Sequence, residues 1–437
     1  MFKRILQVLM TGLLLVTPVA IATSATQQGV QAATATSAPQ VDASAAIAID
    51  PQSGQVLYEK NADQVLPIAS MTKMITAYIV LDQIKQGKLK WDQTTKPDAA
   101  IYKLSQDKEL TNVPLQADKA YSVRELYQAM LIASANDAAM MLANLVAGSQ
   151  KNFVDLMRQQ VSQWGIKDAK LYSVSGLNNQ YLTGETYPGS AADAENEMSA
   201  SEVAIVAQHL LKTFPEVLET TKQTAFTFGP KTIDETKMAT WNLMLPGQNN
   251  APKDYVVDGL KTGTTDKAGD CFTGTATKDG QRILTVVMHA NGSDKGRRFI
   301  ETNKVMQYVF DNWQQTQLVK KGATIKPFAT ADVKYGRTKT VALETPQAIA
   351  MWVPKGTQVA NIDWEYQVVQ GGQKRQLTAP VKKAAVIGKV TPKIAGVTNR
   401  YLGTTPQYTV QTKTADPKAN VFVLIGTGVR EFFTNLF

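Results

Sequence analysis

A change of hydrophobic pattern near Trp313 is the feature that most constrains the fold. Before it, apolar segments at helical spacing are mixed with short runs typical of strands. From residue 329 to about residue 411, short alternating segments such as 340–343 and 348–353 are separated by turns. A chain of 437 residues also exceeds the usual size of a single core. We therefore expect a mixed α/β (α+β) domain followed by a small all-β domain.

The stretch 67–80 places a serine and a lysine one helical turn apart. A proline and a small polar residue precede an apolar run without Gly or Pro, so a helix is expected to begin close to Ser70. Ser70 and Lys73 then share one face, beside backbone N–H groups that favour a developing negative charge. These are features that a serine nucleophile needs. The pattern is loose, however, because residues 105–108 match it in a polar stretch without a helical pattern.

A second polar cluster stands between two expected helices. Ser122 and Glu125 form a capping box that opens a helix through Leu131, and an apolar run follows at 138–146. Two helices meeting at the turn 134–136 would expose the Ser134 hydroxyl and the Asn136 carboxamide together. Both residue types are also common helix caps, so this cluster alone does not decide between a cap and a site.

The third cluster is Lys261-Thr262-Gly263, the only Lys-Thr-Gly in the chain. The segments 269–277 and 283–288 that follow it have the composition of strands. A glycine at position 263 would let a substrate backbone approach the strand closely. Near the N-terminus, the segments 45–50 and 55–59 are joined by a four-residue turn and predict a hairpin.

Ser-x-x-Lys, Ser-x-Asn and Lys-Thr-Gly occur in this order at positions 70, 134 and 261. With these motifs the sequence closely resembles the penicillin-binding proteins and serine β-lactamases, and within them the low-molecular-weight D-alanyl-D-alanine carboxypeptidases. The resemblance covers about residues 45–313. It implies a catalytic domain over 45–315 with an antiparallel sheet and helices on both faces. A polar linker is expected over 314–326, and a C-terminal β-sandwich over 316–411.

The resemblance also implies a role for each motif residue. Ser70 would attack the carbonyl between the last two D-alanines of a peptidoglycan stem peptide, with neutral Lys73 as general base. Ser134 would pass the proton to the leaving amine, and Asn136 would hold the substrate amide. The backbone N–H groups of Ser70 and Thr264 would form the oxyanion hole. The expected substrate-binding residues are Lys261, Thr262, Gly263, Thr264 and Arg298, with neighbouring Arg297 as an alternative to Arg298.

Related activities remain as alternatives. A serine β-lactamase would turn over penicillin, but no Glu-x-x-x-Asn element of the class A enzymes lies between the second and third motifs. A DD-endopeptidase would differ only in how its leaving group fits outside the motifs. A non-enzymatic wall-binding protein is disfavoured by the three intact motifs. For a peptidase of this type, β-lactam antibiotics are expected to be covalent inhibitors.

Few residues suit metal or histidine chemistry. The chain has two histidines, His209 and His289, and both lie in segments that predict structural roles. Cys271 is the only cysteine and is expected to be a buried thiol. A Ser-His-Asp triad, a zinc site and an intrachain disulfide are therefore not expected, and no metal or organic cofactor is implied.

The N-terminus has the pattern of an export signal. Lys3 and Arg4 precede an apolar run over 5–22, and small residues predict cleavage after residue 32. A retained membrane anchor is the alternative, which the polar and helix-breaking residues in the run disfavour. A disordered leader is expected over 33–44. Cleavage would reduce the net charge from +9 to +7, which favours anionic surfaces. Nucleic acid is disfavoured because the basic residues are scattered.

The last expected segment, 412–437, ends in apolar residues at helical spacing from Phe422 to Leu436. It is too short and too interrupted for a membrane span, so we expect an amphipathic anchor lying in the interface. A helix packed on the core is the alternative. Proteins of the family that the chain resembles commonly anchor themselves in this way.

Overall fold

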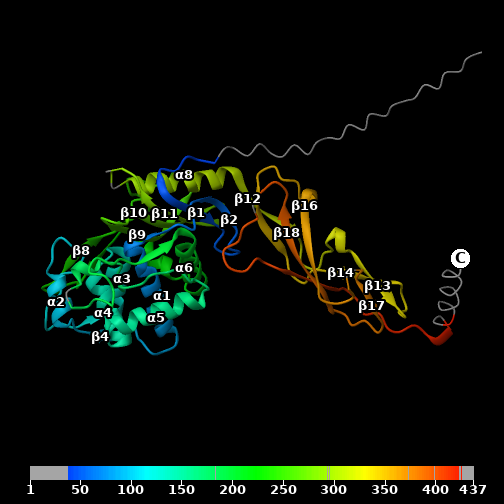
Figure 1. The fold of residues 1–437 in the computed structure, drawn as a ribbon, viewed down its shortest axis with the longest axis horizontal. Coiled ribbons are helices and arrows are strands. Elements are labelled where there is room, and N and C mark those ends of the chain that lie inside the picture. The colour runs from blue at the N-terminus through cyan, green and yellow to red at the C-terminus, as the bar shows by residue number, and fades with distance from the viewer. Residues whose placement is uncertain are drawn as a thin grey trace, which may run out of the picture.

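The computed structural model describes residues 38–422 and 425, except 183, 293, 295, 373 and 398. These residues form a mixed domain of sheet and helices, followed by an elongated domain built almost entirely of strands (Figure 1). The predicted fold class is thereby confirmed. The expected signal peptide, 1–32, lies outside the described residues. Within the described part of the chain, no helix is both long enough and apolar enough to cross a membrane.

Five antiparallel strands form the central sheet of the first domain, in the order β2-β1-β11-β10-β9. The strands are β1 (Ala43–Ile49), β2 (Val56–Lys60), β9 (Val256–Thr265), β10 (Gly269–Lys278) and β11 (Gln281–Ala290). Side chains alternate across the sheet: Ile47 and Ile49 join the core on one face, and Ala46 joins the core on the other. Both faces of the sheet are therefore buried.

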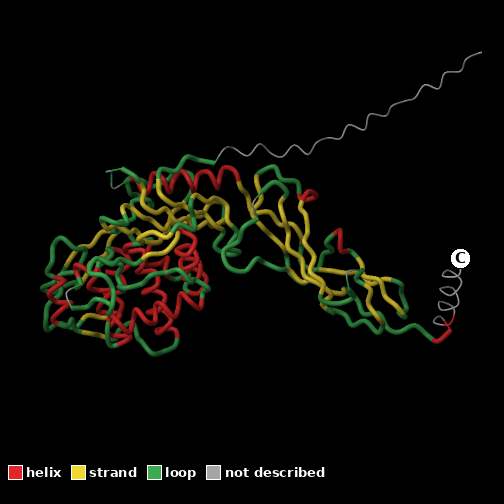
Figure 2. The backbone as a smooth tube through the Cα atoms, viewed as in Figure 1, coloured by secondary structure: helices red, strands yellow, loops and turns green. Residues whose placement is uncertain are grey.

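Helices cover both faces of this sheet. α8 (Arg297–Asn312) packs on one face against β1, β2, β10 and β11, and α6 (Ala200–Thr213) packs on the other. Further helices extend the layer on the α6 side (Figure 2). They are α1 (Lys73–Lys85), α3 (Val123–Ile132), α4 (Asn136–Ala147) and α5 (Gln150–Gln163). The motif residues therefore occur where this helical layer meets the edge strand β9.

Short elements complete the first domain. The helical ones are η1 (Ala69–Thr72), α2 (Ala99–Ser105), η2 (Asn179–Tyr181) and α7 (Val217–Thr221). The two-stranded pairs are β3 (Val65–Pro67) with β6 (Glu197–Ser199), β4 (Thr94–Thr95) with β5 (Tyr121–Ser122), and β7 (Ala225–Phe228) with β8 (Thr236–Ala239).

The second domain encloses its own apolar core between a two-stranded and a six-stranded sheet. The small sheet pairs β12 (Trp313–Val319) with β15 (Ile349–Pro354). The larger sheet has the order β16-β18-β19-β14-β13-β17. Its strands are β13 (Thr330–Lys334), β14 (Thr340–Glu344), β16 (Ile362–Val368), β17 (Gln376–Thr378), β18 (Val386–Ile394) and β19 (Tyr408–Thr412), and short 3₁₀ turns are η3 (Lys326–Phe328) and η4 (Val359–Asn361).

Three expected boundaries are corrected by the structure. β1 begins at Ala43 and Val41 is buried, so residues 41–44 do not belong to a disordered leader. The predicted linker 314–326 begins with strand β12, whose polar side chains alternate between half-buried and exposed positions and so hide the strand in the composition. Residues 412–419 still pair with the second domain, through Thr412 of β19 and the N–H of Ala419. The remainder of the predicted anchor lies largely outside the described residues.

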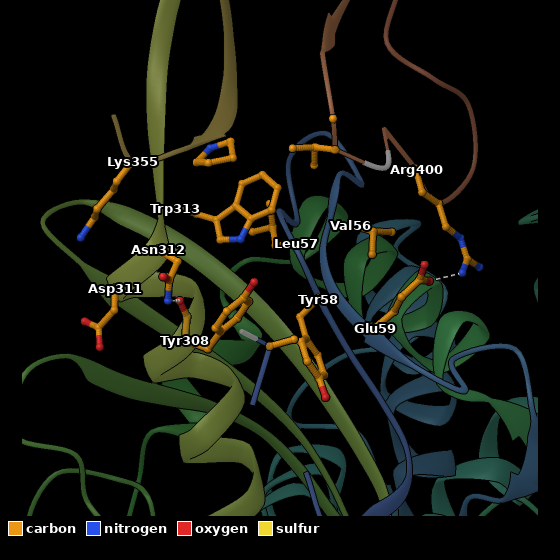
Figure 3. A pocket seen from close by; sticks show the side chains of 14 residues that line it. Val56, Leu57, Tyr58, Glu59, Tyr308, Asp311, Asn312, Trp313, Lys355 and Arg400 are labelled. Atoms are coloured by element: carbon orange, nitrogen blue, oxygen red, sulfur yellow. Dashed lines mark hydrogen bonds and ion pairs between the residues drawn. The ribbon is translucent and has the colours of Figure 1, made fainter. Parts of the chain in front are cut away.

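The turn between β1 and β2 ties the two domains together. The Gln55 side chain donates from Nε2 to the Trp352 carbonyl at 2.7 Å and accepts from the Trp352 N–H at 3.0 Å. The N–H of Val56 also donates to the carbonyl of Arg400 at 2.9 Å. At the same junction Tyr58, Tyr308 and Trp313 border a cavity of about 440 Å³ (Figure 3), which none of the predicted site residues lines.

Candidate active site

Ser70 and Lys73 are brought into direct contact. Ser70 lies in the 3₁₀ turn η1, and α1 begins at Lys73, three residues after the expected helix start. The Nζ atom of Lys73 donates to Ser70 Oγ at 2.8 Å, to Asn136 Oδ1 at 2.8 Å and to the Ser175 carbonyl at 2.8 Å. The other two oxygen atoms therefore hold the amine in contact with the serine hydroxyl.

The environment of Lys73 favours a neutral amine. Its side chain is fully buried. Burial lowers the pKa of Lys73 well below its usual value, the nearby charge of Lys261 lowers this pKa further, and Asp137 opposes the shift. Burial also lowers the pKa of Lys261 to about 7, with a smaller effect of Arg298 in the same direction. A neutral Lys73 can accept a proton from the serine hydroxyl 2.8 Å away.

The competing match at 105–108 has a different setting. Ser105 ends helix α2, and its hydroxyl donates to the Tyr102 carbonyl at 2.7 Å. Lys108 is exposed on the following turn. A helix C-terminus carries unsatisfied carbonyl groups and not N–H groups, so it does not suit a developing anion.

Ser134 lies in the turn between α3 and α4, as the pattern predicts, and Asn136 is the first residue of α4. Ser134 has a φ of +67°, which few non-glycine residues adopt. The Ser134 hydroxyl lines the same cleft as Ser70. Asn136 is fixed at both ends, since its Oδ1 accepts from Lys73 and its Nδ2 donates to the Thr111 carbonyl at 3.0 Å. Strained but fixed backbone of this kind is frequent at functional sites.

The third motif lies on β9, the edge strand that faces η1. Lys261 is 2% exposed, and its Nζ donates to the Thr262 carbonyl at 3.0 Å. Gly263 lies so close to the residue before η1 that an added Cβ would be 2.8 Å from the Ile68 carbonyl oxygen. The glycine is thus required for close packing of β9 against the turn that carries Ser70. Thr262 and Thr264 line the cleft beyond it.

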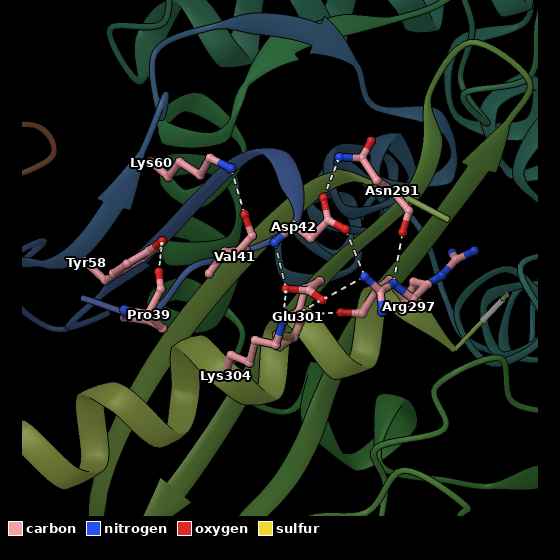
Figure 4. Close-up of polar contacts among 11 residues, drawn as sticks. Pro39, Val41, Asp42, Tyr58, Lys60, Asn291, Arg297, Glu301 and Lys304 are labelled. Carbon is pink, nitrogen blue, oxygen red and sulfur yellow. Dashed lines mark hydrogen bonds and ion pairs between the residues drawn. The ribbon is translucent and has the colours of Figure 1, made fainter. Parts of the chain in front are cut away.

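The structure separates the two candidate arginines. Arg298 lies at the cleft, where Nη1 donates to the Gly263 carbonyl at 2.9 Å and Nη2 donates to Thr264 Oγ1 at 2.7 Å. Arg297 points away and bonds to Asp42 and to the carbonyl of Asn291 (Figure 4). Arg298 is therefore the arginine available to a ligand in the cleft.

Several residues of the site carry no sequence motif. The carbonyl of Ser175 holds Lys73, and the segment that contains it is fixed by Asn196, whose Nδ2 donates to Ser173 O at 2.7 Å and to Thr72 Oγ1 at 3.0 Å. Gly176 permits this approach, because a Cβ there would lie 1.9 Å from the Ala69 carbonyl oxygen. A backbone carbonyl from a loop leaves no recognisable pattern in the sequence.

Five of the predicted residues line a cleft of about 810 Å³, namely Ser70, Ser134, Thr262, Thr264 and Arg298. Its walls also include Trp241, which is 53% exposed and whose Nε1 donates to the Ala133 carbonyl at 3.1 Å. His289 borders the cleft, whereas His209 stacks on Trp164 in the helical layer. Cys271 is fully buried, as predicted, and burial raises its pKa to about 12. Within the described ranges, no group of three His, Cys, Asp or Glu side chains is arranged to hold a metal ion.

Comparison with known families agrees with this arrangement. The model of the Peptidase_S11 family, described as D-alanyl-D-alanine carboxypeptidase, matches residues 32–292. The chain belongs to this family. The model of the penicillin-binding protein 5 C-terminal domain matches residues 313–414. The two matched ranges correspond to the two domains of the fold.

Individual relatives cover most of the chain. The D-alanyl-D-alanine carboxypeptidase DacC of Escherichia coli is 32% identical over 362 residues, which are 82% of each chain. The crystal structure of a peptidoglycan synthesis regulatory factor (PBP3) from Streptococcus pneumoniae superposes with a TM-score of 0.71 at 35% identity, covering 86% of this chain and all of the other. Penicillin-binding protein D2 of Listeria monocytogenes in its cefotaxime-bound form has a TM-score of 0.51 at 32% identity, covering 62% of this chain and 98% of the other.

The family membership confirms the predicted activity. The chain is a D-alanyl-D-alanine carboxypeptidase of the S11 family, with a peptidase domain and the associated all-β domain. The alternatives of a β-lactamase, a DD-endopeptidase or a wall-binding protein without activity are not favoured by these findings.

Proposed function

We propose that Ser70 is the nucleophile with which this carboxypeptidase forms an acyl-enzyme on peptidoglycan stem peptides. The single observation that carries the proposal is the 2.8 Å hydrogen bond from Lys73 Nζ to Ser70 Oγ, in a site where burial lowers the lysine pKa. Neutral Lys73 accepts the hydroxyl proton as Ser70 Oγ attacks the carbonyl between the two D-alanines. The C–N bond then breaks and free D-alanine leaves.

The leaving amine needs a proton as the C–N bond breaks. Ser134 lines the cleft two residues before Asn136, which contacts Lys73, and we assign to the Ser134 hydroxyl the transfer of the proton from Lys73 to the amine. Asn136 holds both the amine of Lys73 and the amide of the bound peptide. Water then hydrolyses the ester and regenerates Ser70.

We assign recognition of the negatively charged C-terminus of the substrate to residues of β9 and α8. Lys261, Thr262, Thr264 and Arg298 lie along one wall of the cleft or directly behind it. Their ammonium, hydroxyl and guanidinium groups suit the terminal carboxylate of the substrate. The backbone N–H groups of Ser70 and Thr264 are assigned to the oxyanion hole. A donor of this kind commonly contributes about 3 kcal/mol to transition-state stabilisation.

We extend the proposal to β-lactam inhibitors and to the location of the enzyme in the cell. β-Lactams should acylate Ser70, which is consistent with the cefotaxime-bound form of the Listeria relative. We also propose that residues 1–32 direct export, so that the enzyme works at the cell wall. The C-terminal segment is proposed to rest on a membrane surface, because apolar residues recur in it at helical spacing.

Release of D-alanine tests the proposed nucleophile. The full-length mature chain is incubated with an N-acylated tripeptide ending in D-Ala-D-Ala, and D-alanine is quantified. Wild-type protein should release one D-alanine per peptide, whereas Ser70→Ala should release none while keeping the wild-type melting temperature. Normal release by Ser70→Ala would overturn the assignment of the nucleophile.

A further inference from the structure

Arg298 is paired with a carboxylate of the protein itself, and that carboxylate lines the cleft. Its Nη2 atom forms an ion pair with Asp270 Oδ1, and Asp270 also accepts from Thr264 Oγ1 at 3.5 Å. Asp270 and Thr264 are direct partners across β9 and β10, so they share one face of the sheet. Both line the cleft that contains Ser70.

The other donors of Arg298 are already engaged or enclosed. Nη1 donates to the carbonyls of Gly263 and Cys271 at 2.9 and 3.2 Å. Nε is buried and has no hydrogen-bond partner among the described residues. The Arg298 side chain is 7% exposed and the Asp270 side chain is 12% exposed. Nη2 is therefore the donor that a ligand in the cleft can reach, and its partners are Thr264 and Asp270.

We propose that Asp270 is a specificity-determining residue that competes with the terminal carboxylate of the substrate for Arg298 and Thr264. A substrate carboxylate at this position must displace Asp270 or lie beside it. Two negative charges on one guanidinium nitrogen disfavour each other, which makes Asp270 a repulsive element against tight carboxylate binding. The inference rests on the proposed role of Arg298 and Thr264 in carboxylate recognition.

The predicted effect of Asp270 on binding depends on the C-terminal group of the substrate. Removing the charge of Asp270 should strengthen binding of a peptide that ends in a free carboxylate. It should not strengthen binding of the same peptide ending in a carboxamide, which brings no second negative charge. The quantity that reports the effect is the ratio of kcat/KM for the acid substrate to kcat/KM for the amide substrate.

The test compares four proteins on the matched acid and amide tripeptides. Asp270→Asn keeps the shape and one acceptor oxygen. Asp266→Asn is the control, because Asp266 lines the same cleft without any hydrogen bond to Arg298. Arg298→Gln removes the guanidinium, and the wild type is the reference. The melting temperature, measured by calorimetry, checks that each variant is folded independently of carboxylate binding.

Asp270→Asn should raise the acid-to-amide ratio at least about threefold, mainly through a lower KM for the acid, and Asp266→Asn should leave it unchanged. An unchanged or lower ratio in Asp270→Asn would show that Asp270 only positions Arg298, and would overturn the inference. An equal rise in Asp266→Asn would overturn it as well, because a general charge effect would then be sufficient.

Arg298→Gln separates this inference from the proposed function. If the ratio collapses in Arg298→Gln but does not rise in Asp270→Asn, carboxylate recognition by Arg298 holds and only the competition by Asp270 fails. If Arg298→Gln keeps the wild-type ratio, the proposed carboxylate site itself is wrong, and the inference falls with it.

Discussion

The amine of Lys73 lies 2.8 Å from the hydroxyl of Ser70, and the lysine side chain has no exposed surface. Exposed lysines keep their proton at neutral pH, so this pair depends on the burial that lowers the Lys73 pKa. The same residues that place the amine, Asn136 and the Ser175 carbonyl, also satisfy its hydrogen bonds. The cost of burying a polar group is thereby reduced.

Lys73→Arg should nearly abolish activity. A guanidinium cannot give up its proton in a protein, and it is larger than the ammonium group that the fully buried side chain of Lys73 carries. We expect kcat/KM for D-alanine release to fall by about 10²–10⁴-fold. Lys108→Arg is the matched control, because it changes the lysine of the second Ser-x-x-Lys match, where the serine is bonded to Tyr102. Activity of Lys73→Arg close to that of Lys108→Arg would contradict a general-base role.

The rate of Ser70 acylation should rise with pH. Lys73 must be neutral to accept a proton, so the rate follows deprotonation through its lowered pKa. Lys261→Asn removes one positive charge that lowers this pKa, although burial, the larger cause, remains. The rising limb of the pH profile should therefore move to higher pH in Lys261→Asn. Stopped-flow acylation by benzylpenicillin measures the limb, and a shift to lower pH would contradict the assigned coupling.

Gly176→Ala should distort the turn η1, which carries Ser70. A Cβ at position 176 would lie 1.9 Å from the carbonyl oxygen of Ala69. Gly189 has the same φ of +79° with no atom within 4 Å of its added Cβ, so Gly189→Ala isolates the cost of backbone strain. That strain is about 1–2 kcal/mol in both variants. Gly176→Ala should in addition acylate at least about tenfold more slowly with benzylpenicillin, since near-attack geometry is lost. Equal behaviour of the two variants would refute the close approach.

Gln55→Glu should loosen the domain junction. The Gln55 amide both donates to and accepts from the backbone of Trp352, and a carboxylate cannot donate to the Trp352 carbonyl. Loss of a buried hydrogen bond costs about 1–3 kcal/mol, which at about 2–4 °C per kcal/mol corresponds to a decrease in Tm of about 2–12 °C. Gln52→Glu makes the same change at an exposed position of this turn and should leave Tm unaltered. Calorimetry measures the Tm of each variant. An unchanged Tm for Gln55→Glu would argue against the hydrogen bonds between Gln55 and Trp352 at the domain junction.

The sequence predicted the parts of the site that depend on side-chain chemistry at fixed spacing. Ser70 with Lys73, and Ser134 with Asn136, are local patterns. The structure places the two serines in one cleft and joins the pairs through the hydrogen bond from Lys73 to Asn136. Thr262 and Thr264, beside Lys261, reach the same cleft because β9 packs on the turn η1. The order of the three motifs therefore carried information that none of them carried alone.

Other features could not be predicted, for identifiable physical reasons. The Ser175 carbonyl acts through backbone, which any residue could supply. Strand β12 has polar side chains, since one side of its small sheet is exposed. The contact of Asp270 with Arg298 depends on how β10 and α8 pack, and position 270 lies outside every motif. Local patterns do not determine such tertiary contacts.

The central claim is that Ser70 is the nucleophile, and mass spectrometry of the intact protein followed by peptide mapping tests it most directly. The mature chain is exposed briefly to benzylpenicillin, digested and mapped, with Ser70→Ala as the control. We predict one penicilloyl group per chain, located on the peptide that contains Ser70, persisting for many minutes and absent from Ser70→Ala. An adduct on another residue, or an equal adduct on Ser70→Ala, would contradict the account.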